Sequence, residues 1–268
     1  MRSTVQSGTP MHAPDELKTL VDEALEQHEL WPSLHGQRDS ARYGLVEMGG
    51  KRIRPVISLA VGEALEAPPE EVMPAALALE LVHNFSLVHD DLPSLDNDSE
   101  RRGKPSVWAE YGEGKAVLAG DALLAEAFRL AAGYPTADVV RELAHATLGM
   151  IGGQYLDTME RDTADLEQVH RLKTGCLFYA SVAMPLWAAG VPEDEQGPWR
   201  DFGDELGLLF QIVDDILDQD GYVLTKGEDG ARQLADRAGE QALAMLLEIP
   251  ADTSVLTEIV NGLVVRTA

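Results

Sequence analysis

The residues best able to do chemistry in this sequence are two clusters of aspartates. One lies in HDDLPSLDND, from His89 to Asp98, and the other in FQIVDDILDQDG, from Phe210 to Gly221. Each follows an apolar run that we expect to be a buried helix. Carboxylates gathered at buried helix ends repel one another and lose hydration unless cations hold them. The clusters therefore predict one cavity with a divalent metal, and magnesium is expected because it combines carboxylates with water and phosphate oxygens.

In the first cluster, helical spacing groups the aspartates with a histidine. His83 and Asp90 are about two turns apart and share a face, whereas Asp91 is rotated by about 100°. Asp96 follows after Pro93 has disturbed the helix. The spacing predicts that three carboxylates converge at one cavity mouth. For His83 taken alone, a buried histidine with satisfied hydrogen bonds is the simpler interpretation.

In the second cluster, Gln211, Asp214 and Asp218 follow one helical stripe, and Asp215 lies on its flank. A solvated acidic helix end is the alternative interpretation, and for one isolated Asp-Asp pair it would be preferred. Two such pairs, each followed by a further aspartate, favour metal binding.

Basic residues form two short runs in this acidic chain. The runs are GGKRIRP and RRGKP, and their cationic residues are Lys51, Arg52, Arg54, Arg101, Arg102 and Lys104. Arginine forks bind phosphate oxygens in pairs, lysine acts as a point charge, and the two glycines allow close backbone approach. A patch that improves solubility is the alternative. The second run follows the first aspartate cluster directly, which favours two diphosphate sites, one direct and one through metal.

The composition excludes some function classes. The chain has 268 residues, 45% of them hydrophobic, which is enough for one sizeable core. Its net charge of −25 opposes binding to nucleic acid and anionic membrane surfaces. The lone Cys176 cannot form an internal disulfide and the first residues lack a signal-peptide core, so we expect a cytoplasmic protein. The apolar stretch 176–191 is too short to span a bilayer, which argues against stable membrane insertion.

The apolar pattern is helical along almost the whole chain, behind a helix start signal at Pro14-Asp15. The segments 75–91 and 206–217 are apolar on most sides, which predicts helices at the centre of a bundle. Glycine and proline divide the rest into helix-sized pieces. We therefore expect residues 1–14 to be a flexible tail and residues 15–268 to form a single all-α domain.

Several motifs together resemble one family. GGKRIRP, LVHNFSLVHDDLPSLDNDSERRGKPS, GGQYLD, KTG and FQIVDDILD are similar, in order and spacing, to the trans-isoprenyl diphosphate synthase (polyprenyl synthetase) family of short-chain prenyltransferases. The resemblance covers residues 45–220. It implies a bundle of antiparallel helices around a deep central cavity, a homodimer, and head-to-tail condensation of isopentenyl diphosphate with an allylic diphosphate.

The resemblance also implies roles for individual residues. Two motifs would bind about three Mg²⁺ ions on the allylic diphosphate through Asp90, Asp91, Asp96, Asp214, Asp215 and Asp218. The same diphosphate would be assisted by Arg101, Lys173 and Lys226. Isopentenyl diphosphate would be bound by Lys51, Arg54, His83 and Arg102. Thr174 and Gln211 would face the developing allylic cation as catalytic residues beside Lys173, with Gln154 and Asp157 supporting the site.

Product length depends on a less distinctive feature. Phe85 lies five residues before Asp90, about 7.5 Å along the helix, where its ring would floor the cavity under the growing chain. Together with the DDLPSLD motif, this phenylalanine resembles bacterial farnesyl diphosphate synthases more than geranylgeranyl diphosphate synthases, which are the alternative. Phe85 as ordinary core is an equal interpretation, because the neighbouring Ser86 leaves room.

The sequence departs from the family after Asp220, where a longer lysine-bearing loop is usual. Lys226 is the nearest candidate for that lysine. We expect the shortened loop to alter closure of the site, substrate preference or dimer contacts.

Other classes account for fewer of these features. A metal-dependent phosphohydrolase of the His-Asp type would use His83, His89 and Asp90, but it leaves the second cluster and both basic runs unexplained. A terpene cyclase would replace DDILD by a motif with Asn, Ser or Thr, and Glu. A non-catalytic subunit of a heteromeric synthase should have lost carboxylates that are intact here.

Overall fold

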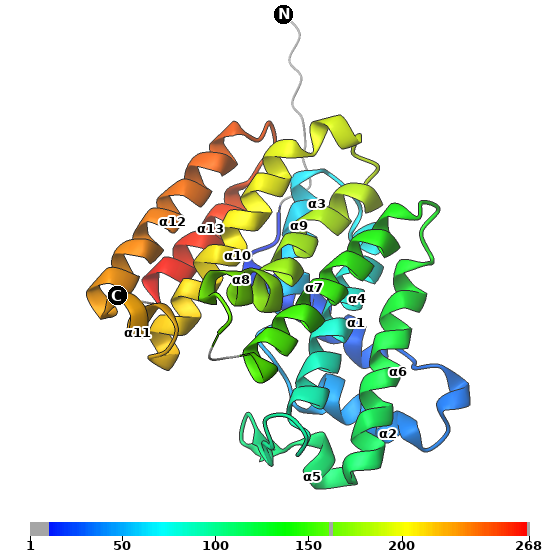
Figure 1. The fold of residues 1–268 in the computed structure, drawn as a ribbon. Helices are drawn as coiled ribbons and strands as arrows, with labels where there is room; N and C mark the ends of the chain where they lie inside the picture. The colour runs from blue at the N-terminus through cyan, green and yellow to red at the C-terminus, as the bar shows by residue number, and fades with distance from the viewer. Residues whose placement is uncertain (1–10, 161–162, 267–268) are drawn as a thin grey trace, which may run out of the picture.

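The computed structural model describes residues 11–160 and 163–266, and these residues are mostly helical (Figure 1). The helices are α1 (Pro14–Gln27), α2 (Gln37–Arg42), α3 (Ile53–Ala64), α4 (Pro69–Asp90), α5 (Val107–Tyr111), α6 (Glu113–Ala131), α7 (Asp138–Met159), α8 (Leu166–His170), α9 (Cys176–Ala188), α10 (Gly197–Asp218), α11 (Tyr222–Lys226), α12 (Glu228–Glu248) and α13 (Ser254–Val265). Shorter helical turns are η1 (Pro32–Leu34), η2 (Tyr43–Glu47), η3 (Arg171–Gly175) and η4 (Glu193–Glu195). The all-α prediction is confirmed.

The only strands within the described ranges are β1 (Glu100–Arg101) and β2 (Lys104–Pro105), which form an antiparallel hairpin. Residues 1–10 of the predicted tail lie outside the described residues, and α1 begins at Pro14 as its start signal predicts.

Helix α4 packs against α3, α6 and α9 and is buried on most sides, as its apolar sequence predicts. It begins at Pro69, earlier than the predicted start at residue 75, because proline at the first helical position lacks only an N–H that would have no helical partner. Pro74 is accommodated inside the helix. By length and composition α4 could also cross a membrane, but 67% of its apolar window is buried within the protein, as in a core helix.

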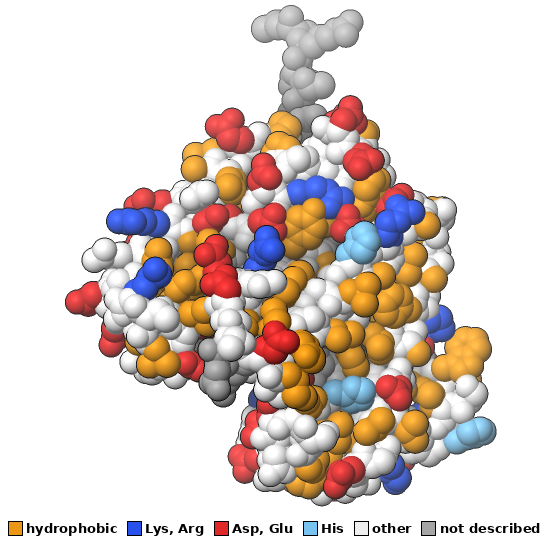
Figure 2. All heavy atoms as spheres, viewed as in Figure 1, with side chains coloured by type: hydrophobic (Ala, Val, Ile, Leu, Met, Phe, Trp, Pro, Cys, Tyr) orange, Lys and Arg blue, Asp and Glu red, His pale blue; other side chains and the backbone are white. Residues whose placement is uncertain are grey.

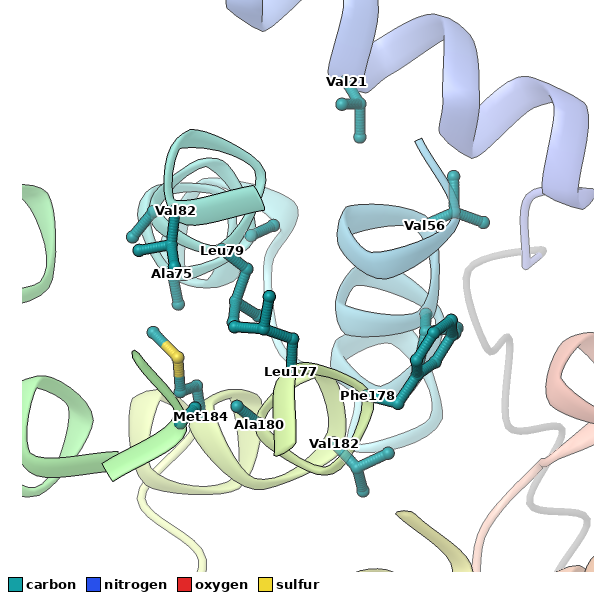
Figure 3. Close-up of a cluster of buried hydrophobic side chains, with 14 of the residues drawn as sticks. Val21, Val56, Ala75, Leu79, Val82, Leu177, Phe178, Ala180, Val182 and Met184 are labelled. Carbon is teal, nitrogen blue, oxygen red and sulfur yellow. The ribbon is translucent and has the colours of Figure 1, made fainter. Parts of the chain in front are cut away.

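The side chains of three helices interlock in the core beside the functional segments. Figure 3 shows Leu79 of α4 against Leu177 of α9, and Phe178 of α9 lying beside α3. This packing fixes α3, α4 and α9, and with them the positions of their ends, relative to one another. Helix α10 packs against α9 and α12 and begins at Gly197, earlier than the predicted residue 206. The sequence motifs lie at or beside these helix ends.

Candidate active site

A cavity of about 600 Å³ lies between the ends of these helices. Its lining includes the predicted site residues Lys51, Arg54, His83, Phe85, Ser86, Asp90, Arg101, Arg102, Gln154, Lys173, Thr174 and Asp214. Among the described residues, the predicted ones that do not line it are Asp91, Asp96, Asp157, Gln211, Asp215, Asp218 and Lys226. The structure thus brings together one aspartate of each cluster and both basic runs.

Arg52 and Glu80 also line the cavity, although sequence reasoning did not select them as site residues. A signal was present, because Glu80 is the single charged residue in the apolar stretch 72–82. A charged residue in a fully buried helix needs a partner, and here that partner is Arg52, 2.7 Å away.

Asp90 faces the cavity from the C-terminal end of α4. Burial raises the pKa of this carboxyl to about 7, Lys173 opposes the shift, and the charge of Asp96 adds to it. Without a cation, Asp90 is therefore only partly ionised near neutral pH. A bound cation would favour the ionised form.

Asp91 does not face the cavity, although the sequence predicts it as a metal ligand. It is 1% exposed and accepts hydrogen bonds from Arg101 Nε and Nη2 at 2.8 and 2.6 Å. This fork contact is possible because the β1–β2 hairpin places Arg101 beside the end of α4. In the structure Asp91 therefore orients an arginine that lines the cavity.

In the second cluster, Asp214 faces the cavity and Asp215 is turned away from it. Burial and the charge of Asp218 raise the pKa of Asp214, while Lys51 opposes the shift. Asp215 is 5% exposed and accepts hydrogen bonds from Gln211 Nε2 at 2.7 Å and from the backbone N–H of Tyr222 at 2.8 Å. Burial raises its pKa, and these hydrogen bonds counteract the rise.

The sequence predicts that Gln211 faces a developing cation, but the structure directs its amide to Asp215. Gly221 makes this arrangement possible. Its φ is +48°, and a Cβ there would lie 2.1 Å from Asp215 Oδ2. Gln211 and Gly221 therefore hold the carboxylate of Asp215 in place rather than lining the cavity.

Lys173 enters the cavity from η3, a wide helical turn of the π type that is common at functional sites. Its ammonium donates to Asp157, so Asp157 supports the site through Lys173. Gly153 allows η3 to approach α7, because a Cβ there would lie 2.2 Å from the backbone nitrogen of Lys173. Gln154 follows on the cavity wall, and its Oε1 is buried with no hydrogen-bond partner among the described residues.

The lining also includes basic residues, and we call the part formed by Lys51, Arg54, His83 and Arg102 the basic wall. Arg54 is 8% exposed and stacks on the ring of Phe178 at 4.6 Å, and its Nε has no hydrogen-bond partner within the described part of the chain. Burial, followed by the charges of Arg54 and Arg102, holds the pKa of His83 well below its ordinary value. His83 is therefore neutral and can both donate and accept. This wall is suited to an anion that needs direct contacts.

Lys226 does not join the site. It is exposed on α11, because the chain turns from α10 into α12 almost at once. Lys226 is not among the residues that line the cavity, and its role at a diphosphate stays a prediction.

The acidic residues fit magnesium that is shared with a substrate. Among the described residues, no three His, Cys, Asp or Glu side chains already form a cation site. Asp90 and Asp214 nevertheless present oxygen donors to one cavity, and burial raises the pKa of both. Magnesium is commonly held by one or two carboxylates with substrate phosphates completing its shell. This donor set therefore fits such an ion.

These features define an all-α fold of the isoprenoid synthase type. Its central cavity has an acidic wall, formed by Asp90 and Asp214, and a basic wall. The sequence matches the family model for polyprenyl synthetase over residues 38–237, and the chain belongs to that family. The resemblance seen in the sequence motifs is thereby confirmed.

Individual relatives support this placement. A geranylgeranyl diphosphate synthase of Cyanophora paradoxa is 44% identical over 194 residues, which are 67% of this chain and 64% of that protein. A farnesyl diphosphate synthase of Geobacillus stearothermophilus is 37% identical over 249 residues, which are 87% of this chain and 83% of that protein. A geranyltransferase structure from Legionella pneumophila matches with a TM-score of 0.85 and 32% identity, covering 94% of this chain and 96% of that one. The chain thus spans less than two thirds of the first relative and most of the other two.

Proposed function

We propose that the protein is a magnesium-dependent short-chain trans-prenyltransferase that joins isopentenyl diphosphate to dimethylallyl or geranyl diphosphate. One observation carries the proposal: Asp90 and Asp214, from helices far apart in the sequence, face one cavity that also presents Lys51, Arg54 and Arg102. An acidic wall suits a diphosphate bound through metal, and a basic wall suits a diphosphate bound directly. The cavity is therefore suited to two diphosphates at once.

The first step is departure of the allylic diphosphate, which takes the electron pair of the C–O bond. Magnesium, about three ions held by Asp90, Asp214 and the substrate phosphates, would supply positive charge to this leaving group. Lys173, held by Asp157, and Arg101, held by Asp91, add fixed positive charge at the same place.

The second step is carbon–carbon bond formation. The electron pair of the isopentenyl double bond attacks the allylic cation, and a proton then leaves to an oxygen of the released diphosphate. Met150, Leu177 and Phe210 line the cavity and limit the water that would otherwise capture the cation. Thr174 also lines it, with a hydroxyl oxygen able to face the positive charge.

Farnesyl diphosphate is the proposed product. Phe85 is 7% exposed and lines the cavity one to two turns below Asp90, where its ring would limit the growing chain. His89 packs edge-on against this ring with 5.0 Å between the ring centroids, and this contact supports the position of the Phe85 ring. Geranylgeranyl diphosphate is the alternative, because relatives named for either product are comparably similar.

We also propose a homodimer. Large apolar side chains are exposed along α6 and α7, namely Val117, Leu118, Leu148, Ile151, Tyr155 and Met159. Figure 2 shows apolar side chains gathered over these two helices. An exposed apolar face of this kind is typical of a protein interface, and a second copy of the same face would cover it by two-fold symmetry.

The function is tested by incubating the purified chain with isopentenyl and dimethylallyl diphosphates and Mg²⁺, followed by chromatography of the prenyl products. Asp90→Asn and Asp214→Asn should each lower turnover by a factor of about 10² or more. Asp194→Asn, in the exposed turn η4, serves as the matched control and should leave turnover unchanged. Release of diphosphate without a longer prenyl chain would instead favour a phosphohydrolase. No turnover at all would favour a non-catalytic subunit.

A further inference from the structure

Arg52 lies between Lys51 and Arg54 in the sequence and lines the same cavity, but its guanidinium is paired with protein groups. Its backbone is left-handed, with φ 53° and ψ 29°, and its side chain is only 2% exposed. A residue with a Cβ adopts this conformation only when its surroundings hold it there. Lys51, Arg52 and Arg54 all contribute to the cavity lining, but the guanidinium of Arg52 pairs with side chains of α1 and α4.

All three guanidinium nitrogens of Arg52 are engaged. Nε donates to Asp22 Oδ1 at 3.0 Å, Nη1 to Glu80 Oε1 at 2.7 Å, and Nη2 to the carbonyl of Leu45 at 3.1 Å. Asp22 belongs to α1 and Glu80 to α4, so this side chain joins the basic loop to two helices. Because each of its three nitrogens already donates to a protein oxygen, Arg52 would influence a substrate mainly through its neighbours.

The neighbour that matters most is Glu80. This carboxylate is 3% exposed and lines the same cavity as Arg54 and Arg102. Burial lowers the pKa of Arg54 to about 10 and that of Arg102 below its ordinary value, and Glu80 is the strongest charge opposing both shifts. Glu80 is thus placed to compete with an anionic ligand for both arginines.

We propose that Arg52 is a positioning residue that holds Glu80, so that Arg54 and Arg102 stay available to the diphosphate of isopentenyl diphosphate. This inference rests on the proposed function and adds a residue to it. Removing the guanidinium leaves a buried carboxylate that requires another positive partner. Arg54 and Arg102 are the cations it would recruit, and their pairing with Glu80 would weaken the direct diphosphate site.

Steady-state kinetics of Arg52→Met separate this role from a purely structural one. The KM for isopentenyl diphosphate should rise about tenfold, the loss expected for one charge-assisted contact. The KM for the allylic diphosphate should change less than about twofold, because that ligand is bound on the acidic wall. The double variant Arg52→Met/Glu80→Gln should recover the isopentenyl KM, since an amide has no charge with which to recruit the arginines.

A matched control removes another partly buried arginine. Arg200 donates to Glu142 at 2.6 Å and does not line the cavity. Arg200→Met should lower the unfolding temperature without changing either KM. Equal losses for both substrates in Arg52→Met, or no recovery in the double variant, would overturn the role assigned to Arg52.

Failure of the proposed function would be seen differently: the wild-type protein would not lengthen the prenyl chain of any allylic diphosphate. Titration calorimetry with inorganic diphosphate then decides the role of Arg52. Weaker binding by Arg52→Met that recovers in the double variant supports the role, and equal affinities overturn it. If Arg52→Met does not fold, Arg52→Lys replaces it in each comparison, because one ammonium cannot span the three acceptors.

Discussion

Gln211 donates a hydrogen bond of 2.7 Å to Asp215, four residues further along α10. This contact restrains an aspartate of the second motif. Asp215 directly follows Asp214, the proposed magnesium ligand, and loss of a residue that supports a metal ligand typically weakens metal binding by about 10- to 100-fold. We therefore expect Gln211→Leu to raise the magnesium concentration for half-maximal turnover by at least about tenfold. Gln241→Leu, on the exposed face of α12, should leave the magnesium dependence unchanged; the same dependence in both variants would remove Gln211 from the site.

Asp157→Asn should slow catalysis because it weakens the restraint on the ammonium of Lys173. We expect kcat to fall about tenfold, as for the loss of one oriented charge, with little change in the KM for isopentenyl diphosphate. Rapid-quench measurement of a single turnover would assign the loss to the chemical step. An isopentenyl KM that rises while kcat is preserved would contradict a role through Lys173.

Phe85→Ala should lengthen the product, because removing the ring opens the floor below Asp90. Mass spectrometry of the prenyl products should show chains at least one five-carbon unit longer than those of the wild type. Phe128→Ala, on α6 and away from the cavity lining, is the control and should keep the wild-type length. An unchanged length in Phe85→Ala would return Phe85 to the role of ordinary core.

Glu126 should make stability depend on pH in the acidic range. Burial opposes its ionisation, but hydrogen bonds from His28 and Arg129 lower its pKa from an ordinary value of 4.5 to about 2. Because the folded-state pKa is the lower one, this stabilisation is fully present above pH 4.5 and is lost as the pH falls towards 2. Urea unfolding should show Glu126→Gln about 2 kcal/mol less stable at pH 7, with the difference vanishing near pH 2. A difference that stays constant with pH would contradict the assigned pKa.

If the exposed apolar face of α6 and α7 forms the proposed homodimer interface, charged substitutions on this face should separate the two subunits. Leu148→Glu/Tyr155→Glu should halve the molar mass measured by light scattering after size exclusion, because carboxylates would be buried opposite apolar side chains. Leu247→Glu, at an 85% exposed position on α12, should keep the wild-type mass. A monomeric wild-type chain would refute the homodimer.

Local patterns were sufficient to predict the class of fold and part of the site. The helical period placed α4 and α10 at the centre, and the aspartate spacing placed Asp90 and Asp214 at one cavity. The helix predictions depend on side chains within a few turns of one another, which helix geometry fixes, and the shared cavity follows because two buried acidic clusters need a common cation.

The remaining assignments depend on contacts between distant segments. Asp91 is occupied by Arg101 only because a hairpin returns to the end of α4. The carboxylate of Asp215 is fixed partly by the backbone of Tyr222, which follows a turn that the sequence does not specify. The partnership of Arg52 with Glu80 likewise joins residues 28 positions apart.

The β1–β2 hairpin has a consequence for substrate selectivity. Arg101 and Arg102 are consecutive, yet the first contacts Asp91 beside the acidic wall and the second contacts the carbonyl of Gly49 beside the basic wall. A shift of this short ribbon would move both guanidinium groups together. Under the proposed function, we therefore expect a substitution that displaces the ribbon to change the binding of both diphosphates and not of one alone.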